Sequence, residues 1–413
     1  MSRPDGLSQW TSTVSTHFPT LSPAHAAGLA LWSYGIVLAR SCGITSVCVV
    51  LAALLDTKED TLRQRLREWC YDTKHKRGAK RLDVDVQPCF PFLLRWVLAW
   101  WPPDHKRLAL AIDASTLAQR FTVLVISVVY RGCAIPVAWV VLPACTKGAW
   151  KPHWLHLFDL LTDVIPSDWT VIVLADRGLY AKWLFRHIQK HGWHPFLRIN
   201  LGGNVRPEGA ATFRPLSTVV PKVGGQWSGR VTCFSGKESQ LECTLLACWE
   251  EGYKDAWLIV TDMEPEEADA AWYGMRSWIE CGFKDSKRGG WEWHQTKMTD
   301  GGRASRLWLA IAVATLWAVS VGGEADASMA VSSLEELPEM HTARRRASGR
   351  AKPRLVSCFR RGVLRIMVAL VQGKEVPLGR FVPEEWPSEP PAVLVLPLRR
   401  LRLAQPVLVH TYP

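Results

Sequence analysis

The sequence lacks the patterns that mark several common classes of protein. Its 11 cysteines are scattered, and neither a C-x-x-C pair nor the spacing of a zinc ribbon occurs among them. The start, MSRPDGLSQW, does not show the charged-then-apolar pattern of an export signal. These absences, together with an odd number of cysteines, argue against a secreted disulfide scaffold, and we expect reduced thiols in a cytoplasm.

Long uninterrupted hydrophobic runs are missing too. Residues 29–55 are apolar, but Arg40 and several glycines and serines interrupt them. The continuous run LWLAIAVATLWAVSV at 307–321 is shorter than the roughly 20 residues that a membrane-spanning helix requires. Both stretches therefore predict buried helices, and we expect no membrane association.

Basic residues and tryptophan are present in excess. The 413 residues include 50 Lys+Arg against 38 Asp+Glu, which gives a formal net charge of +12 and a pI of about 9.3. Such a balance suggests a polyanionic partner, either nucleic acid or an anionic membrane. Most of the 22 tryptophans are expected in the core, while a few could stack on bases.

The pattern of hydrophobic residues changes along the chain. Helical patterns dominate the first hundred residues, and from residue 107 the order is three strands, helix, strand, helix, strand. A stretch with a glycine-rich start and short strands follows, and we expect it to fold as a small β subdomain outside the central sheet. We divide the chain into a helical N-terminal region (1–104), an α/β core (105–200), a β-rich insertion (201–262), the second part of the core (263–325) and a basic, proline-containing C-terminal region (326–413).

The most informative pattern is Y-x2-R-x3-E-x6-K, formed by Tyr273, Arg276, Glu280 and Lys287. At about 100° per residue, these four side chains fall within an arc of roughly 60° on a helix. The apolar residues of the same segment fall on the other side. The pattern thus predicts one helix with an apolar face for the core and an outer stripe of one acid, two bases and a phenol.

Two acidic residues follow apolar strands upstream of this segment. Asp113 ends LALAID and Asp176 ends WTVIVLAD. If these strands are neighbours, the two carboxylates lie close together, and a cation is needed to neutralise them. With Glu280 as a third oxygen ligand, the set suits hard Mg²⁺, and two such ions can support an in-line displacement at phosphorus. Mn²⁺ is expected to substitute.

Other patterns are weaker. His153-x2-His156 and His187-x3-His191 have spacings that could bind a transition metal, but each lies in an amphipathic helix, which favours solvated or structural histidines. The basic stretches RLREW (65–69) and Arg344–Arg346 either contact a DNA backbone or form solvated surface. The sequence leaves both alternatives open.

Asp113, the segment Asp176-Arg177-Gly178-x-Tyr180 and the Y-x2-R-x3-E-x6-K pattern together resemble the DDE transposases of bacterial insertion sequences. The resemblance is to the group with the YREK signature, insertion-sequence family four, and covers about residues 105–322. It implies a ribonuclease-H-like core, with a mixed five-stranded sheet and flanking helices, interrupted by the β-rich insertion. By resemblance, Asp113, Asp176 and Glu280 are the catalytic metal ligands.

The same resemblance implies cut-and-paste transposition of double-stranded DNA, with cleavage at the terminal inverted repeats and strand transfer into target DNA. Such enzymes act as homodimers on paired ends, here in a bacterial cytoplasm in association with the nucleoid. By resemblance, Tyr273, Arg276 and Lys287 contact transposon-end DNA near the cleaved phosphate. A ribonuclease-H-like nuclease without strand transfer, and an inactive DNA-binding protein derived from a transposase, are the alternatives.

Some members of the family flip a base out of the transposon end and stack it on a tryptophan of the insertion. Trp227, Trp249 and Trp257 are the candidates here, and spacing does not choose firmly among them. We favour Trp257, because it is nearest to the signature segment in sequence, and expect one of the three to be accessible in the cleft of Asp113.

Overall fold

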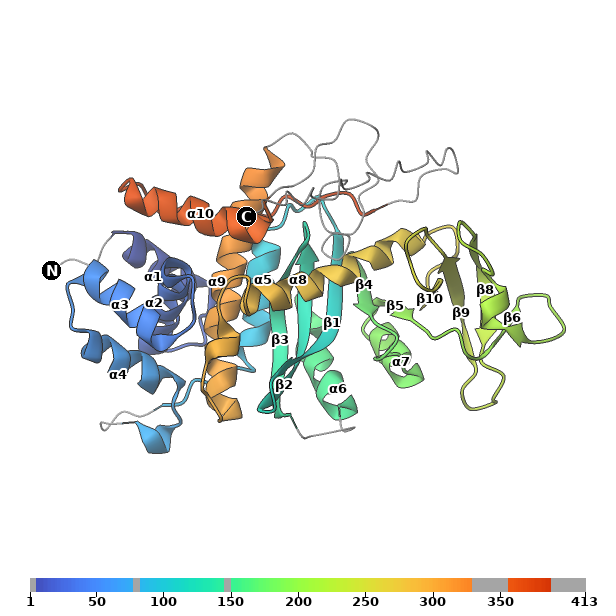
Figure 1. The fold of residues 1–413 in the computed structure, drawn as a ribbon, viewed down its shortest axis with the longest axis horizontal. Helices are drawn as coiled ribbons and strands as arrows, with labels where there is room; N and C mark the ends of the chain where they lie inside the picture. The colour runs from blue at the N-terminus through green and yellow to red at the C-terminus, as the bar shows by residue number, and fades with distance from the viewer. Residues whose placement is uncertain (1–4, 77–81, 145–149, 329–355, 388–413) are drawn as a thin grey trace, which may run out of the picture.

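The computed structural model describes residues 5–76, 82–144, 150–328 and 356–387 (Figure 1). Over these ranges the chain forms a mixed α/β fold, in which helices pack around one large mixed sheet. The run Arg344–Arg346, for which phosphate contact and solvated surface were both open, lies outside the described residues.

Helices make up the N-terminal part, as the sequence pattern predicts. Helix α2 begins where Ser22 accepts a hydrogen bond from the N–H of His25 and Pro23 occupies the first turn. It is buried on most sides because it packs against its neighbours and against a long helix near the C-terminus. The helices here are α1 (Asp5–His17), α2 (Pro23–Ala39), α3 (Ile44–Leu55), α4 (Glu59–Cys70) and α5 (Cys89–Ala99), with a short 3₁₀ helix, η1 (Thr73–His75).

A five-stranded segment with the order β3-β2-β1-β4-β5 forms the centre of the sheet. The first three strands are an antiparallel meander, and β4 then pairs parallel to β1, with Ile112 opposite Ala175. β5 in turn pairs parallel to β4. The strands are β1 (Arg107–Leu117), β2 (Phe121–Tyr130), β3 (Cys133–Pro143), β4 (Thr170–Ala175) and β5 (His194–Arg198).

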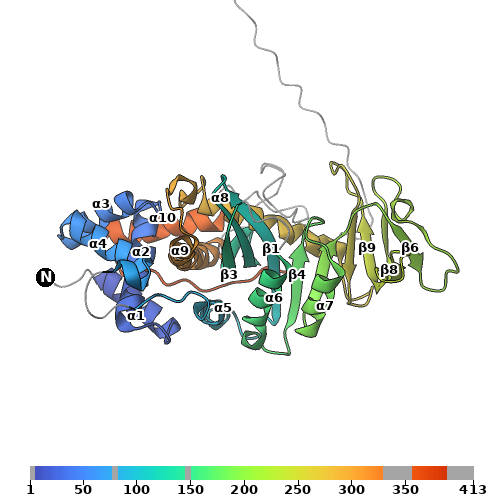
Figure 2. The ribbon, with the colours of Figure 1, turned by 90° about the horizontal axis from the view of Figure 1, so that it is seen from below.

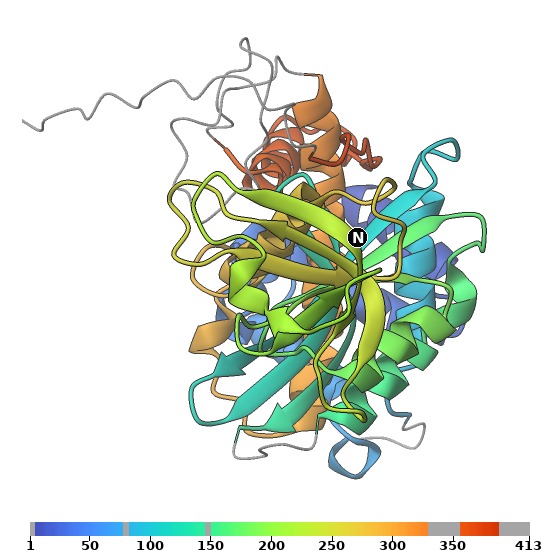
Figure 3. The same ribbon diagram turned by 90° about the vertical axis from the view of Figure 1, so that its right-hand side faces the viewer.

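The insertion does not form a separate sheet, so that expectation is wrong. Its last strand, β10 (Trp257–Thr261), pairs antiparallel with β5 through Ile259–Arg198 and Val260–Leu197. The open edge of β5 therefore gains a partner, and the sheet runs on to ten strands. Figure 3 looks at this end of the molecule. The remaining elements are β6 (Asn204–Pro207), β7 (Arg214–Pro215), η3 (Leu216–Thr218), β8 (Gln226–Cys233) and β9 (Leu241–Cys248).

Different helices cover the two faces of the core sheet (Figure 2). Side chains alternate between the faces of a strand, so Leu110 and Ile112 join the apolar cluster beneath α6 and α7. Ala109 and Ala111 join a second cluster, with the signature segment. The helices on the first face are α6 (Lys151–Asp159) and α7 (Lys182–Lys190), with η2 (Thr162–Val164) between them; η4 (Ala270–Ser277) and α8 (Trp278–Ser286) lie on the second.

The long helix α9 (Gly301–Ala327) stands between the N-terminal helices and β3 (Figure 1). Among the described residues it is the one helix long and apolar enough to cross a membrane, and its most apolar 18-residue window is 94% buried inside the protein. Helices α2 and α3 pass the same test only as a pair, and they meet at 96°. The burial of α9 agrees with the expected core helix.

A C-terminal segment closes the fold, and the sequence analysis did not predict its structure. Helix α10 (Cys358–Val371) crosses α9, and the extended residues 374–387 then run back over the core. Tyr130 accepts a hydrogen bond from the N–H of Val382 and donates to its carbonyl. Arg131 forms ion pairs with Asp326, at 3.0 Å, and Glu384, at 2.7 Å. These contacts fasten the extended segment to the β2–β3 turn and to the end of α9.

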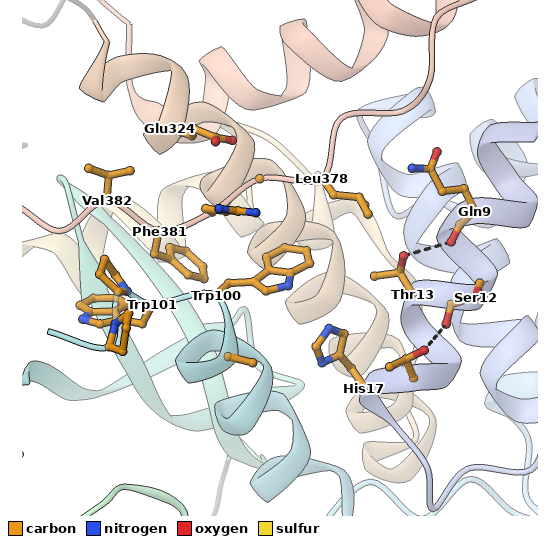
Figure 4. Close-up of a pocket in the computed structure, with 16 residues that line it drawn as sticks. Gln9, Ser12, Thr13, His17, Trp100, Trp101, Glu324, Leu378, Phe381 and Val382 are labelled. Carbon is orange, nitrogen blue, oxygen red and sulfur yellow. Dashed lines mark hydrogen bonds between the residues drawn. The ribbon is translucent and has the colours of Figure 1, made fainter. Parts of the chain in front are cut away.

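A cavity of about 1050 Å³ lies where this segment meets α1 and the end of α5 (Figure 4). Its lining includes Trp100, Trp101 and Phe381, and His17, whose ring stacks on Trp96 at 4.4 Å. Burial lowers the pKa of His17 to about 4, so the ring is neutral at pH 7. The lining is mixed: aromatic side chains come from the end of α5 and the extended segment, and α1 adds the polar residues Gln9, Ser12, Thr13 and Thr16.

Glycine permits the close crossing of α9 and α10. A methyl group at Gly362 would collide with the carbonyl oxygen of Ala318, and one at Gly322 would collide with that of Cys358. We expect Gly362→Ala to lower the free energy of unfolding by about 1–3 kcal/mol through overpacking. Thermal or denaturant unfolding would measure this. Gly202→Ala, where a methyl group meets no atom within 4 Å, is the control, and equal losses in both variants would contradict the assignment.

Candidate active site

The parallel pairing of β1 and β4 brings Asp113 and Asp176 side by side. Ile112 is opposite Ala175, so the two aspartates follow at the same level, where β4 ends. Each carboxylate accepts a hydrogen bond from the N–H of the next residue, Asp113 from Ala114 at 2.8 Å and Asp176 from Arg177 at 2.7 Å. The predicted adjacency of these two acids is therefore present in the fold.

The signature segment is not the single α-helix that its spacing predicted. It begins as the 3₁₀ helix η4, where Asp269 accepts a hydrogen bond from the N–H of Ala271, and continues as α8. The apolar face is nevertheless as expected, since Met275 and Ile279 are each 1% exposed against the sheet. This packing fixes the segment across the strands that carry the aspartates.

Tyr273 does not lie on an outer stripe, in contrast to the helical prediction. Its side chain is buried, 4% exposed, and burial raises its pKa. Tyr273 belongs to the apolar cluster that the signature segment forms with the sheet. Its ring meets that of Trp257 at 5.1 Å and 76°, an edge-to-face contact.

Arg276 lies among all three predicted carboxylates. One guanidinium nitrogen is 2.7 Å from Asp113 Oδ2 and 3.9 Å from Asp176 Oδ2, and the other contacts Glu280 Oε1. The Arg276 side chain is 12% exposed, and the Glu280 side chain is 50% exposed. Solvent therefore reaches the cluster at Glu280 of α8, whereas the guanidinium of Arg276 is largely shielded from solvent.

Charge balance explains this arrangement. Burial raises the pKa of Asp113, and the positive charge of Arg276 opposes that shift. Burial would lower the pKa of Arg276, but Asp113 and the neighbouring acids outweigh it and raise the pKa. A cation is therefore required between the carboxylates, and the guanidinium supplies it.

The same place suits a divalent cation. All three acidic side chains offer carboxylate oxygen, which is the donor type that Mg²⁺ and Mn²⁺ prefer. Within the described part of the chain, however, the oxygens of Asp113, Asp176 and Glu280 do not all lie within 4.8 Å of one another. The carboxylate oxygens surround the guanidinium of Arg276. A metal ion is smaller than a guanidinium, so these oxygens would have to move closer together to bind one.

Lys287 lies beyond the helix, at the C-cap of α8. Its ammonium donates to Ser115 Oγ at 2.7 Å and to the carbonyl of Thr116 at 2.8 Å. Burial lowers its pKa. Lys287 thereby ties the end of the signature segment to β1, two residues after Asp113.

The three candidate tryptophans of the insertion lie in different surroundings, and each is partly exposed. Trp257 packs against Tyr273, as described above, and against Tyr253 at 4.8 Å. Trp249 donates to the carbonyl of Tyr253. Trp227 lines a separate cavity of about 500 Å³. Of the three, Trp257 has a ring contact with Tyr273 of the signature segment, and its role in base stacking stays a prediction.

One neighbour of the site was missed. Trp386, from the extended C-terminal segment, meets Trp272 of η4 at 4.9 Å, and the Arg107 guanidinium lies 4.0 Å from its ring centroid. No local pattern predicts this contact, because it depends on the path of a proline-containing segment far along the chain. The contact supports the first turn of the signature segment.

Comparison with known proteins gives one family. The model of the family described as "Transposase DDE domain" matches residues 106–317, from the start of β1 to within α9. A search of the curated proteins finds no match.

Removal of the central guanidinium tests the charge balance. We expect Arg276→Gln to lower the free energy of unfolding in metal-free buffer by about 1–3 kcal/mol, less than for a fully buried pair because Glu280 is half exposed. Added Mn²⁺ should then raise the melting temperature of the variant more than that of the wild type.

The control is Arg230→Gln, which removes an exposed pair with Glu264 and should change stability by no more than about 0.5 kcal/mol. Its response to Mn²⁺ should equal that of the wild type. An Arg276→Gln variant with the same Mn²⁺ response as the wild type would show that the guanidinium and the ion do not share this place.

Proposed function

The chain belongs to the family of transposases that share a DDE domain, and on that premise we propose that it moves an insertion sequence by cut-and-paste transposition. The reaction would cleave double-stranded DNA at the terminal inverted repeats and transfer the ends into target DNA. The observation that carries the proposal is the set of three carboxylates, from β1, the end of β4 and α8, around one cation.

Asp113, Asp176 and Glu280 are the proposed ligands of two Mg²⁺ ions, for which Mn²⁺ can substitute. When bound, such ions activate the attacking oxygen and stabilise the leaving oxygen of an in-line displacement. The support is the shared donor type and the need of these neighbouring, partly exposed carboxylates for positive charge.

We assign two successive roles to Arg276. In the structure it neutralises the carboxylates. Once displaced, its guanidinium can donate paired hydrogen bonds to a phosphate oxygen of the transposon end. Because it is held by Asp113 and Glu280 beforehand, the phosphate contact would form next to the reacting bond.

Lys287 and Tyr273 would act beside it. The proposed partner of Lys287 is the DNA backbone near the cleaved phosphate, and its bonds to Ser115 and Thr116 hold it at the level of Asp113. Tyr273 is buried, so its proposed contact with end DNA requires that the phenol become exposed or act through Trp257.

The finer classification is also a proposal. The strand order β3-β2-β1-β4-β5, with the acids on β1 and after β4, supports a ribonuclease-H-like core. The spacing from Tyr273 to Lys287 supports insertion-sequence family four. We also propose action as a homodimer on paired ends, DNA binding by the helical region 1–104 and a cytoplasmic, nucleoid-associated location. The family and the basic charge of the chain support these proposals.

Neutralisation of one carboxylate tests the catalytic assignment. Asp113→Asn, Asp176→Asn and Glu280→Gln should each reduce Mg²⁺-dependent cleavage of DNA that carries the flanking inverted repeats by at least about 10³-fold. Binding to that DNA should stay within about threefold, because phosphate contacts by basic residues remain. Cleavage and gel-shift assays on the same preparations measure both.

Asp168→Asn is the matched control, since Asp168 precedes β4 at its other end and pairs with Lys106 on the surface. It should cleave like the wild type. If one of the three variants also did so, that residue would not be a ligand. Joining of the cleaved end to target DNA separates a transposase from a nuclease, and binding without any cleavage would indicate an inactive DNA-binding protein.

Trp257 can be tested for base stacking. Trp257→Ala should weaken binding of end DNA with an unpaired terminal base by about 1–3 kcal/mol, the usual loss for one stacked base. Trp257→Phe should recover part of this loss. Trp249→Ala, which removes an indole that donates to the carbonyl of Tyr253, is the control and should bind normally. If Trp257→Ala, Trp257→Phe and Trp249→Ala all bound this DNA as tightly as the wild type, stacking on Trp257 would be excluded.

A further inference from the structure

Asp159, His187 and His191 form a compact group outside the carboxylate cluster. His187 Nε2 and His191 Nε2 lie 3.1 Å apart, and Asp159 Oδ1 is 3.4 Å from the first and 3.2 Å from the second. The two imidazole rings are perpendicular, with their centroids 4.5 Å apart. Each of the three residues offers one ligand atom, and these atoms all lie within 4.8 Å of one another; among the described residues, this is the group of three or more His, Cys, Asp or Glu side chains that meets this condition.

The fold explains how the three side chains meet. Asp159 is the last residue of α6, while His187 and His191 are four residues apart at the end of α7 and therefore lie on one helical face. This end of α7 leads into the start of β5, which lies toward the opposite end of the parallel strands β4 and β5 from Asp176. His194 is opposite Ile172, four residues before Asp176, so the start of β5 lies roughly 13 Å along the strands from Asp176.

The distances match the edges of a coordination polyhedron. Zn²⁺ binds imidazole nitrogen and carboxylate oxygen at about 2.0–2.2 Å, which makes the edge of a tetrahedral site about 3.3 Å. The three measured edges are 3.1, 3.2 and 3.4 Å. One ion therefore fits above this triangle with only small side-chain movements.

A hydrogen-bond relay presents the correct nitrogen of His191. Thr162 Oγ1 donates to the carbonyl of Phe158 at 3.2 Å, so its single proton is in use and it accepts from His191 Nδ1 at 2.7 Å. The proton of the neutral ring is then on Nδ1, and Nε2 carries the free lone pair. Burial lowers the pKa of His191. A partner of this kind on the second nitrogen is usual for metal-bound histidine.

His187 has a choice of partner. Its Nε2 lies 3.2 Å from the carbonyl of Leu155, to which it can donate when no ion is present. Ion binding would move that proton to Nδ1 or to solvent. The side chains of His187 and His191 are 11% and 5% exposed, whereas that of Asp159 is 54% exposed, so water can supply a fourth ligand from the side of Asp159.

We propose that Asp159, His187 and His191 bind one Zn²⁺ ion, with water as the fourth ligand, and that this ion joins the end of α6 to the end of α7. Borderline ligands of this kind, two imidazoles and one carboxylate, favour a transition metal over Mg²⁺. The zinc site is structural, and its place toward the opposite end of β4 and β5 from Asp176 makes zinc binding independent of DNA cleavage at Asp113.

Zinc binding by the full chain tests this proposal. Metal-free protein is dialysed against Zn²⁺ in excess Mg²⁺, which occupies the hard-oxygen site, and bound zinc is measured by elemental analysis. The wild type should retain one equivalent, and His187→Ala and His191→Ala should lose it. Thr162→Val should keep the ligands but bind about 10–100-fold more weakly. Co²⁺ in place of Zn²⁺ should give the visible absorption of tetrahedral cobalt.

Two controls separate the zinc site from other effects. His153→Ala removes a histidine of α6 that is not part of the group and should retain one equivalent. Asp113→Ala should retain it as well, so a failure of the proposed catalysis would not affect this result. If an alanine variant does not fold, Asp159→Asn is used in its place, because it removes the negative charge of this ligand and keeps the side-chain volume. Absence of retained zinc in the wild type, or equal retention in His191→Ala, would overturn the proposal.

Discussion

The parallel pairing of β1 with β4 is the constraint on which the rest of the site depends. It sets Asp113 and Asp176 at one level, and two carboxylates so placed repel each other unless a positive charge lies between them. Arg276 meets that need, and its position is determined in turn by the packing of Met275 and Ile279 on the sheet. Backbone register, apolar burial and ion pairing thus all lead to one location.

The sequence predicted this part of the molecule well for physical reasons. An apolar run that ends in an acid predicts a buried strand followed by a polar group, and Asp176 follows that rule. Asp113 does not, because β1 continues to Leu117 and pairs Asp113 with Val125 of β2, but the parallel register still places it beside Asp176. The apolar side of the signature segment was predicted for the same reason, since burial follows the spacing of Met275 and Ile279. The family match covers this same region.

Other features depend on interactions that no local pattern contains. Tyr273 is buried in the second apolar cluster, where its ring meets that of Trp257 from the insertion, and Lys287 leaves the helix to reach Ser115. The insertion joins the central sheet because β5 offers an unpaired edge, a need that arises only once the five strands are assembled. His187 and His191 were visible as a pair, but Asp159 comes from another helix, 28 residues before His187.

The extended C-terminal segment also places a condition on the order in which the molecule can be made. Trp386 packs on Trp272 and on Arg107, and Val382 bonds to Tyr130. During synthesis, the residues from 107 to 328 leave the ribosome before these partners exist. The first turn of the signature segment therefore reaches its final packing only when nearly the whole chain has been translated, so a nascent or truncated product lacks part of the support for Arg276.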